Sequence, residues 1–414
     1  MDTNRTNIFQ DIRILDFCQV IAGGYSTTIM ADLGAEVVKV EPPGTGDTMR
    51  LVGPRIKGES SFFLHKSRNK KSICIDLKKQ EGIELIKKLI PHFDAVTENF
   101  TPGVMKKLGL GYDEVREIKE DIIYLSVSGY GQNNDYSDRL AYDIMVQAET
   151  GLTSLNGLPE QGRPLRSPLS VADYAAATYG ALGLASALYH HDRTGKGQYI
   201  DVAMYDSLIS FMDNTFLICD AFRDDIEKGA DQEQLGLLNT GNRHPDAAPH
   251  GIYKTLDGYI AHTQLSNAMW HALLKIIGKK ELISDQSYNT LKGRIKHWKK
   301  IDMMIEQWTK EHTSDEVVKI FKENKLPVGK IRTVYETFNN AHNEKRGVFT
   351  EIEHPVSGKR KVTSIPVKFS ETPARVNDPS PSLGEHNYDV FSDILGYTKE
   401  QIDKLVEKGI LHNK

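Results

Sequence analysis

ILDFCQVIAGG at residues 14–24 and AEVVKVEPPG at residues 35–44 decide the fold of this chain. Residues 12–17 form a short apolar run of β-forming residues, which a pair of glycines interrupts. Residues 25–33 then place apolar side chains at helical spacing, a glycine ends this helix, and residues 37–40 begin a second strand. The pattern predicts a strand–helix–strand unit, which is the usual beginning of a parallel sheet that handles nucleotides.

Composition sets the class of protein. The 414 residues carry a formal net charge of -4, with 39% hydrophobic and 26% charged residues. These values predict a globular enzyme of two or more domains that binds neither nucleic acid nor a membrane. The three cysteines, Cys18, Cys74 and Cys219, form no C-x-x-C pair, which favours a reducing cytoplasm and argues against a disulfide framework. No signal peptide or spanning apolar run is visible, so we expect a cytoplasmic protein.

The alternation of strands and helices continues along the N-terminal half. We expect strands at residues 72–77, 94–100, 122–128 and 198–203, and helices at residues 79–89, 104–108, 173–191 and 204–219. These elements define a large α/β domain over residues 1–222. A smaller α+β domain with its linker is predicted over residues 223–330, and residues 331–414 return to the large domain.

The smaller domain begins with a charged stretch at residues 223–234, which we interpret as a linker. Residues 251–262 carry an Asp-Gly pair between two β-forming runs, which predicts a hairpin. Helical patterns follow at residues 266–278, 300–312 and 314–324, strand and loop at residues 330–380, and two closing helices at residues 388–396 and 399–408.

Several segments together resemble the family III CoA-transferases, which include formyl-CoA and carnitine-type CoA-transferases and the α-methylacyl-CoA racemases. They lie at residues 14–17, 32–41, 98–104, 108–112 and 383–386. The resemblance runs over nearly the whole chain. It implies a Rossmann-like large domain built from both chain ends, a smaller domain between long linkers, and a homodimer of interlocked chains. The sequence itself shows no interlocking.

Asp173 is the residue to which the resemblance assigns the chemistry. It implies that this aspartate attacks an acyl-CoA, forms a mixed anhydride and then an aspartyl-CoA thioester, and passes CoA to a carboxylic acid. The position, at the start of a predicted helix, favours an ionised carboxylate by about 0.3–1 kcal/mol when exposed, and backbone N–H groups of the same turn could hold an oxyanion. Without the resemblance, Ser170 and Asp173 read as a capping box.

Tyr142 and Asp143 separate the two chemistries of the resembled family. The racemases need a histidine directly before the acidic residue, and this chain has Tyr142 there. A phenol is a poor general base at neutral pH, which favours a transferase. By the same resemblance Asp143 supports the nucleophile, and an equally weighted alternative is the N-cap of the next helix.

A CoA site follows from the resemblance. The residues expected to bind CoA, in the first turn, at a strand end and at the phosphates, are Gln19, Val20, Ala22, Asn99, Phe100, Lys70, Lys71, Lys78, Lys107 and Tyr142. Lysine suits a phosphate as a point charge. Without the resemblance, residues 66–71 read as a solvated basic loop, since charged residues are mostly exposed.

Residues 240–251 depart from the formyl-CoA transferases, which have four consecutive glycines where this chain has Ala-Ala-Pro. Formyl or oxalate specificity is therefore not predicted. Arg243, His244 and His250 either meet an acceptor carboxylate or serve packing. The histidines show no metal-binding spacing, so we predict no metal and no prosthetic group.

Four functions stay open at the level of sequence. The first is a CoA-transferase that moves CoA from an acyl-CoA to a small carboxylic acid. The second is an acyl-CoA racemase on the same scaffold, and the third is a CoA-binding protein without turnover. An NAD dehydrogenase is the fourth, because Glu41 ends the second strand where a ribose-binding acid belongs, but the missing G-x-G-x-x-G motif argues against it.

Overall fold

The computed structural model describes residues 6–159 and 162–413, which divide into two compact units. Unit 1 contains both ends of the chain and consists of Met1–Thr150, Pro168–Phe211 and Ala341–Lys414. Unit 2 consists of Gly151–Ser167 and Met212–Asn340. The sequence predicts domain boundaries after residues 222 and 330, and three segments differ from this: Gly151–Ser167, residues 212–222 and residues 331–340 belong to unit 2 and not to the large domain.

Unit 1 is built on a six-stranded sheet whose strands all run parallel. The strands are β1 (Arg13–Asp16), β2 (Glu36–Glu41), β5 (Lys70–Cys74), β6 (Ala95–Glu98), β7 (Ile123–Ser128) and β10 (Tyr199–Ala203). Their spatial order is β10-β7-β6-β1-β2-β5. This is the doubly wound order of nucleotide-binding folds, and it reverses between β1 and β6, where such folds bind their ligands. The predicted parallel α/β sheet is therefore confirmed.

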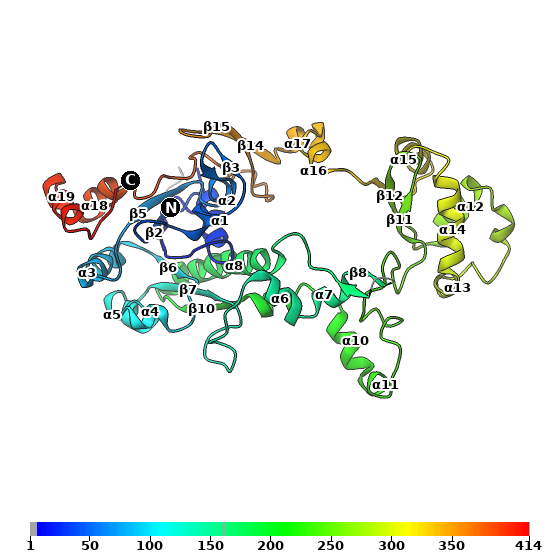
Figure 1. Ribbon diagram of the computed structural model, residues 1–414, viewed down its shortest axis with the longest axis horizontal. Coiled ribbons are helices and arrows are strands. Elements are labelled where there is room, and N and C mark those ends of the chain that lie inside the picture. Colours follow the sequence, from blue (N-terminus) through cyan, green and yellow to red (C-terminus); the bar gives the residue numbers. More distant parts are fainter. Residues whose placement is uncertain (1–5, 160–161, 414) are drawn as a thin grey trace. The chain divides into compact units, whose positions relative to one another are not determined.

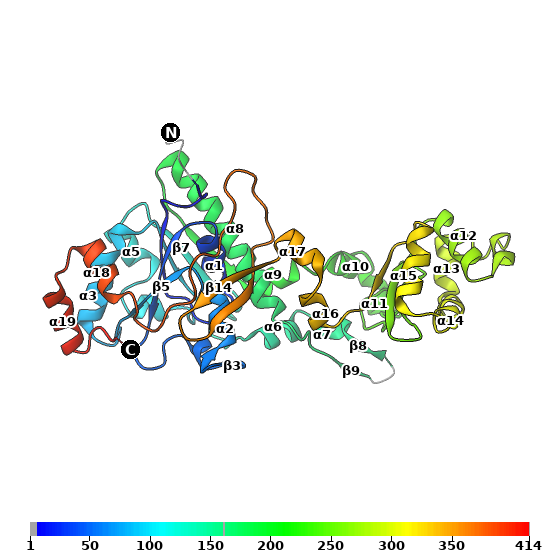
Figure 2. The ribbon, with the colours of Figure 1, turned by 90° about the horizontal axis from the view of Figure 1, so that it is seen from above.

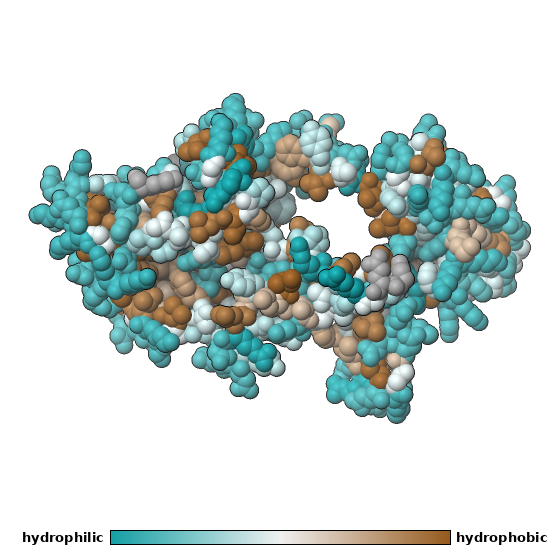
Figure 3. Space-filling model, in the orientation of Figure 1, coloured by the Kyte–Doolittle hydropathy of each residue, from teal (hydrophilic) through white to brown (hydrophobic). Residues whose placement is uncertain are grey.

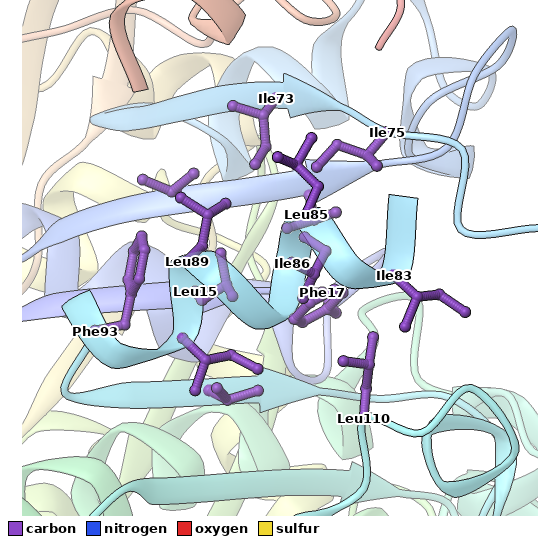
Figure 4. Packing of buried hydrophobic residues seen from close by; sticks show 14 of the residues in the cluster. Leu15, Phe17, Ile73, Ile75, Ile83, Leu85, Ile86, Leu89, Phe93 and Leu110 are labelled. Carbon is purple, nitrogen blue, oxygen red and sulfur yellow. The ribbon is translucent and has the colours of Figure 1, made fainter. Parts of the chain in front are cut away.

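One face of the sheet carries the main hydrophobic core of unit 1. The helices on this face are α3 (Gln80–Leu89), α5 (Tyr112–Ile118), α18 (Asn387–Leu395) and α19 (Lys399–Glu407). Ile83, Ile86 and Leu89 recur at helical spacing along α3 and pack against Leu15 and Phe17 (Figure 4). Helix α18, the second-last helix of the chain, contacts α3, and both views show them side by side (Figures 1 and 2).

The opposite face is covered by α1 (Gly24–Asp32) and α8 (Val171–Thr194), which contact each other. α8 buries mainly alanine, glycine and leucine, so it approaches its neighbours closely. A Cβ atom at Gly180 would lie 2.4 Å from the hydroxyl oxygen of Ser26 on α1. The predicted helix of small residues is thus α8 itself, and its small side chains let it pack closely against α1 and the sheet.

Unit 2 has an antiparallel sheet of β11 (His250–Lys254), β12 (Tyr259–Thr263) and β13 (Val328–Lys330). The first two strands are the predicted hairpin. Its helices α12 (Asn267–Ile276), α14 (Trp298–Thr309) and α15 (Ser314–Glu323) enclose a core around Trp270 and Phe321. Hydrophilic residues cover most of its visible surface (Figure 3). The α+β class predicted for this part of the chain is what the structure shows.

Three local predictions are wrong. The helix expected at residues 204–219 is split into α9 (Met204–Ile209) and α10 (Thr215–Ala221), because Asp213 between them has a left-handed φ of 45°. The expected linker contains the helix α11 (Arg223–Glu227). Residues 330–380 contain two unexpected helices, α16 (Val334–Phe338) and α17 (Ala341–Arg346), before the hairpin of β14 (Phe349–His354) and β15 (Gly358–Thr363).

The described chain also contains further short strands and α-helices. They are β3 (Arg55–Ile56), β4 (Glu59–Ser60), α2 (Ser61–Lys66), α4 (Val104–Lys107), α6 (Asp143–Glu149), α7 (Leu152–Leu155), β8 (Gly157–Leu158), β9 (Arg163–Pro164) and α13 (Leu291–Lys296). Within residues 6–159 and 162–413, no helix combines the length and the apolarity needed to cross a bilayer.

Candidate functional site

The turn after β1 is held by the residue that follows β6. The backbone N–H of Gln19 donates to the side-chain oxygen of Asn99 at 2.7 Å, and the Asn99 amide donates to the Gln19 carbonyl at 2.7 Å. β1 and β6 are neighbours at the point where the strand order reverses. Asn99 therefore fixes the backbone of Gln19 at the position where doubly wound sheets bind ligands.

Val20 stores strain in the same turn. Its φ is 59°, a left-handed value that is rare for a β-branched residue and costs about 1–3 kcal/mol. Its backbone N–H donates to the carboxylate of Asp47 at 3.1 Å. Asp47 is in turn paired with the buried Lys39 at 2.8 Å. Asp47 was not among the predicted site residues, because its contact with Val20 spans 27 residues of sequence.

Gly23 lets the turn close tightly. A Cβ atom there would lie 2.5 Å from the sulfur of Cys18 and 3.1 Å from the Cβ atom of Asn99. Only glycine fits between β1 and the strand end after β6 without displacing one of them. The glycine pair that interrupts the first strand thus serves this close approach.

A cavity of about 380 Å³ lies at the carboxyl ends of β1, β6 and β7, beside the start of α8. Its lining includes seven of the predicted site residues, namely Gln19, Val20, Ala22, Asn99, Phe100, Tyr142 and Asp173. All of its lining residues belong to unit 1. Residues far apart in the sequence, which were predicted separately, therefore meet in one pocket.

Asp173 lies in the first turn of α8, and Asp143 serves as the cap of that turn. The carboxylate of Asp143 accepts hydrogen bonds from the backbone N–H groups of Ala172 at 2.8 Å and of Asp173 at 3.4 Å. Its other oxygen accepts from the amide of Gln147 at 2.5 Å. Ser170 makes no side-chain cap, so the capping-box interpretation does not hold.

Asp143 is also not the N-cap of its own helix. It is the first residue of α6, and Tyr142 occupies the N-cap position without a side-chain hydrogen bond. The alternative that Asp143 is the N-cap of the helix that follows it is therefore wrong. Its carboxylate instead accepts a hydrogen bond from a backbone N–H at the N-terminus of α8. This contact places the Asp143 carboxylate within hydrogen-bonding distance of the backbone N–H of the candidate nucleophile, Asp173.

The two carboxylates set the acidity of the site. Burial raises the pKa of Asp173 to about 7, and the negative charge of Asp143 adds to this rise. Because Asp143 takes the N–H groups of Ala172 and Asp173, and the N–H of Tyr174 bonds to Ser170, these groups are not open to an oxyanion. The expectation that the first turn of α8 forms an oxyanion hole is corrected.

A second cavity of about 400 Å³ continues along the same edge of the sheet, at the carboxyl ends of β1, β2 and β5. It shares Gln19 and Phe100 with the first cavity, and its lining includes Pro42, Pro43 and Lys78. The exposed Lys78 lies at the rim, and a lysine there suits a phosphate group. The two cavities together form an elongated site at the carboxyl edge of the sheet.

The other predicted lysines lie elsewhere. The ammonium of Lys70 is buried and bonds to Asp16 at 2.8 Å, to the Gly24 carbonyl at 2.8 Å and to the Thr27 hydroxyl at 2.7 Å. Its three donors are satisfied inside the protein, so the predicted contact of Lys70 with a phosphate does not fit this structure.

The buried ion pair of Asp16 and Lys70 keeps the Asp16 carboxylate ionised. Burial alone would raise the pKa of Asp16, but the charges of Lys70 and Lys39 bring it below its ordinary value. Lys71 pairs with Glu36 at 2.6 Å, away from the two cavities. Lys107 is exposed on α4 and lines neither cavity.

Sequence reasoning missed several polar residues of the first cavity, namely Thr48, Thr101, Ser128, Ser137 and Arg139. Arg139 and Thr48 line it together with Asp173. The guanidinium of Arg139 stacks over the ring of Tyr136 at 3.5 Å and lies 3.7 Å from Glu149. The only sequence signal for Arg139 is its place at the end of the polar loop that follows β7.

Within the described ranges 6–159 and 162–413, no group of three or more histidine, cysteine, aspartate or glutamate side chains could hold a metal ion. The charged side chains of the elongated site include Asp173 and Arg139 in the first cavity and Glu41, Asp76 and Lys78 in the second, and Asp143 is bonded to the backbone N–H of Asp173.

A carboxyl group with a raised pKa, at the carboxyl edge of a doubly wound sheet, is typical of an α/β enzyme that acts on a nucleotide-containing substrate. Comparison with known proteins identifies the family. Residues 9–387 match the family model of CoA-transferase family III, and the chain belongs to this family and is a CoA-transferase.

Named relatives match the chain over most of its length. The succinyl-CoA–D-citramalate CoA-transferase of Chloroflexus aurantiacus is 34% identical over 405 residues, which cover 97% of each chain. The succinyl-CoA:glutarate CoA-transferase of Homo sapiens is 32% identical over 414 residues, which cover 99% of this chain and 91% of the relative. A crystal structure of a CaiB/BaiF family protein from Brucella suis superposes with a TM-score of 0.82 at 28% identity, covering 94% of this chain and 100% of the other.

Proposed function

We propose that this enzyme transfers CoA from succinyl-CoA to a small carboxylic acid through a covalent intermediate on Asp173. The donor is suggested by the relatives, whose names specify succinyl-CoA. The observation that carries the proposal is the position of Asp173, which lines the cavity at the carboxyl edge of the sheet with a second carboxylate bonded to its own backbone N–H.

The reaction begins with attack of a carboxylate oxygen of Asp173 on the thioester carbonyl carbon. The C–S bond breaks, CoA leaves as the thiolate, and a mixed anhydride joins Asp173 to the succinyl group. The thiolate then attacks the aspartyl carbonyl carbon, so that succinate leaves and an aspartyl-CoA thioester remains. The acceptor carboxylate repeats these two steps in reverse order, which releases the new acyl-CoA and restores the Asp173 carboxylate.

The raised pKa of Asp173 suits this double role. A carboxyl group with a pKa of about 7 has a large ionised fraction at neutral pH, and it is a stronger nucleophile than an ordinary aspartate. Burial and Asp143 both disfavour the negative charge, and the charge is relieved when the anhydride forms. Asp143 holds the start of α8 and keeps the nucleophile directed at the cavity.

The elongated site accounts for the size of the substrate. In this proposal the thioester lies beside Asp173, and the nucleotide part of CoA extends past Gln19 and Phe100 toward Lys78. The free carboxylate of the succinyl group pairs with Arg139, a cation that lines the same cavity as the nucleophile. Asn99 contributes by positioning the Gln19 backbone.

Two further expectations, one from the resemblance and one from the cysteines and the N-terminal sequence, stay part of the proposal. We expect a homodimer, and the interlocking of its two chains stays a prediction that light scattering combined with cross-linking would test. The cytoplasmic location likewise stays a prediction.

An exchange assay tests the proposed activity. Wild-type enzyme is incubated with succinyl-CoA and a panel of dicarboxylates and hydroxycarboxylates, and new acyl-CoA esters are identified by mass spectrometry. We expect one or more acceptors to yield an ester, and Asp173→Asn to yield none. Asp192→Asn, an exposed aspartate on the same helix, is the matched control and keeps full activity. Full activity of Asp173→Asn would refute the proposal.

A further inference from the structure

Unit 2 contains a cavity of its own, with a volume of about 490 Å³. It lies between the loop that precedes β11 and the three-stranded sheet, and all of its lining residues belong to unit 2. Its polar side chains include Arg243, His244, His250 and His262. Arg243, His244 and His250 are the residues for which the sequence left acceptor binding and packing open.

The loop that carries the arginine is fixed in place. The amide of Asn242 donates to the carbonyl of Ile252 at 2.9 Å and accepts from the N–H of Ile252 at 2.7 Å. A Cβ atom at Gly251 would lie 2.8 Å from the Asn242 amide nitrogen, so glycine permits this close contact. The hydroxyl of Thr240 donates to the carbonyl of Arg243 at 2.7 Å. Arg243 therefore lies in a turn that is hydrogen-bonded internally and to β11, the first strand of the sheet.

The charges around this cavity favour an anion. Arg243 lies 5.8 Å from the ring centre of Trp298, and its buried Nε atom has no hydrogen-bond partner among the residues that the structure describes. The rings of His244 and His250 lie 4.5 Å apart. Among the described residues that line the cavity, none is an aspartate or a glutamate. A guanidinium without a carboxylate partner in such a place suits a carboxylate ligand.

His262 adds an acceptor that the protein does not use. Its side chain is 4% exposed and its Nδ1 atom lies 2.6 Å from the carbonyl oxygen of Pro327. A carbonyl only accepts, so Nδ1 carries the hydrogen and Nε2 presents a lone pair, which has no partner in the described chain. Burial lowers the pKa of His262 to about 4, so the ring is neutral at physiological pH. An ionised carboxylate cannot donate to this nitrogen, whereas a hydroxyl group can.

We propose that this cavity binds the acceptor acid and selects a small hydroxycarboxylate, whose carboxylate pairs with Arg243 and whose hydroxyl donates to Nε2 of His262. The assignment of the ligand as the acceptor rests on the proposed transferase function. The binding itself does not, because it is a property of unit 2 and requires no reaction.

Calorimetric titration tests the proposal without turnover. Malate and succinate differ by one hydroxyl group, and each is titrated into the full-length Asp173→Asn variant in the absence of CoA. We expect malate to bind roughly three- to tenfold more tightly than succinate, since one neutral hydrogen bond separates them. Arg243→Gln in the same background weakens malate binding roughly tenfold or more. Arg332→Gln, an exposed arginine of unit 2 outside the cavity, leaves it unchanged.

His262→Phe removes the acceptor, and we expect it to bind malate and succinate equally, with its folding checked by thermal melting. If this variant does not fold, the comparison of the two acids on the parent protein decides the question. Equal affinity for malate and succinate, no detectable malate binding, or unchanged malate binding by Arg243→Gln would overturn the proposal. Selective malate binding without transfer by the wild-type enzyme would instead count against the proposed function alone.

Discussion

Replacing the nucleophile should make the protein more stable at neutral and alkaline pH. The pKa of Asp173 is raised from its ordinary value of 3.8 to about 7, mainly by burial. A change of one in pKa corresponds to about 1.36 kcal/mol, so ionised Asp173 would cost the folded state about 4 kcal/mol in full. Because Asp173 is partly exposed, we discount this to about 2 kcal/mol. Asp173→Asn removes the charge, and with it the cost.

The sign of the pH dependence follows from linkage. The folded state holds the proton of Asp173 more tightly than the unfolded chain, so the wild type loses stability as pH rises from 3.8 to about 7. In urea denaturation at pH 5, 6, 7 and 8, the free energy of unfolding of Asp173→Asn relative to that of the wild type should therefore increase with pH, up to about pH 8. Asp192→Asn is the control and should show no such trend over this range. A pH-independent difference, or a variant less stable than the wild type at pH 8, would refute the reasoning.

Three further perturbations test the site. Asp143→Asn removes the charge that helps to raise the pKa of Asp173, so the acidic limb of the profile of kcat/KM against pH should move to lower pH; an unmoved limb would contradict this. Lys70→Met breaks a buried ion pair and should lower the free energy of unfolding, measured in urea, by about 3–5 kcal/mol. Lys78→Met should change it by less than about 0.5 kcal/mol and should raise the KM for succinyl-CoA. Equal stability losses in the two variants would contradict this distinction. Gly23→Ala overpacks the turn and should cost about 1–3 kcal/mol, and a variant as stable as the wild type would show that the turn can yield.

The parallel sheet was predictable because most of its strands contain a short run of β-forming residues that carries its signal locally, although β5 (Lys70–Cys74) starts before the run expected at residues 72–77. The break in the helix expected at residues 204–219 was not predictable, because it depends on the left-handed backbone of Asp213, which the spacing of apolar residues does not encode. The third strand of unit 2, Val328–Lys330, is too short for a periodic pattern and exists only because it pairs with β12.

The candidate site divides in a similar way. The residues of the first cavity were found by resemblance and lie together in the structure. The roles of Asp143 and Lys70 depend on contacts 29 and 54 residues away in sequence, at Ala172 and Asp16. Lys70 precedes the strand predicted at residues 72–77 and reads there as a solvated lysine, whereas the fold makes it the first residue of β5 and buries it against Asp16.

The central claim is that Asp173 becomes covalently bonded to CoA. The most direct measurement incubates the enzyme with succinyl-CoA, adds hydroxylamine, and locates the hydroxamate by peptide mass spectrometry. We predict that the peptide containing Asp173 is labelled only when succinyl-CoA is present, and that the control protein Asp192→Asn is labelled to the same extent. An enzyme that turns over without a label on Asp173, or with the label on another carboxyl group, would contradict the account.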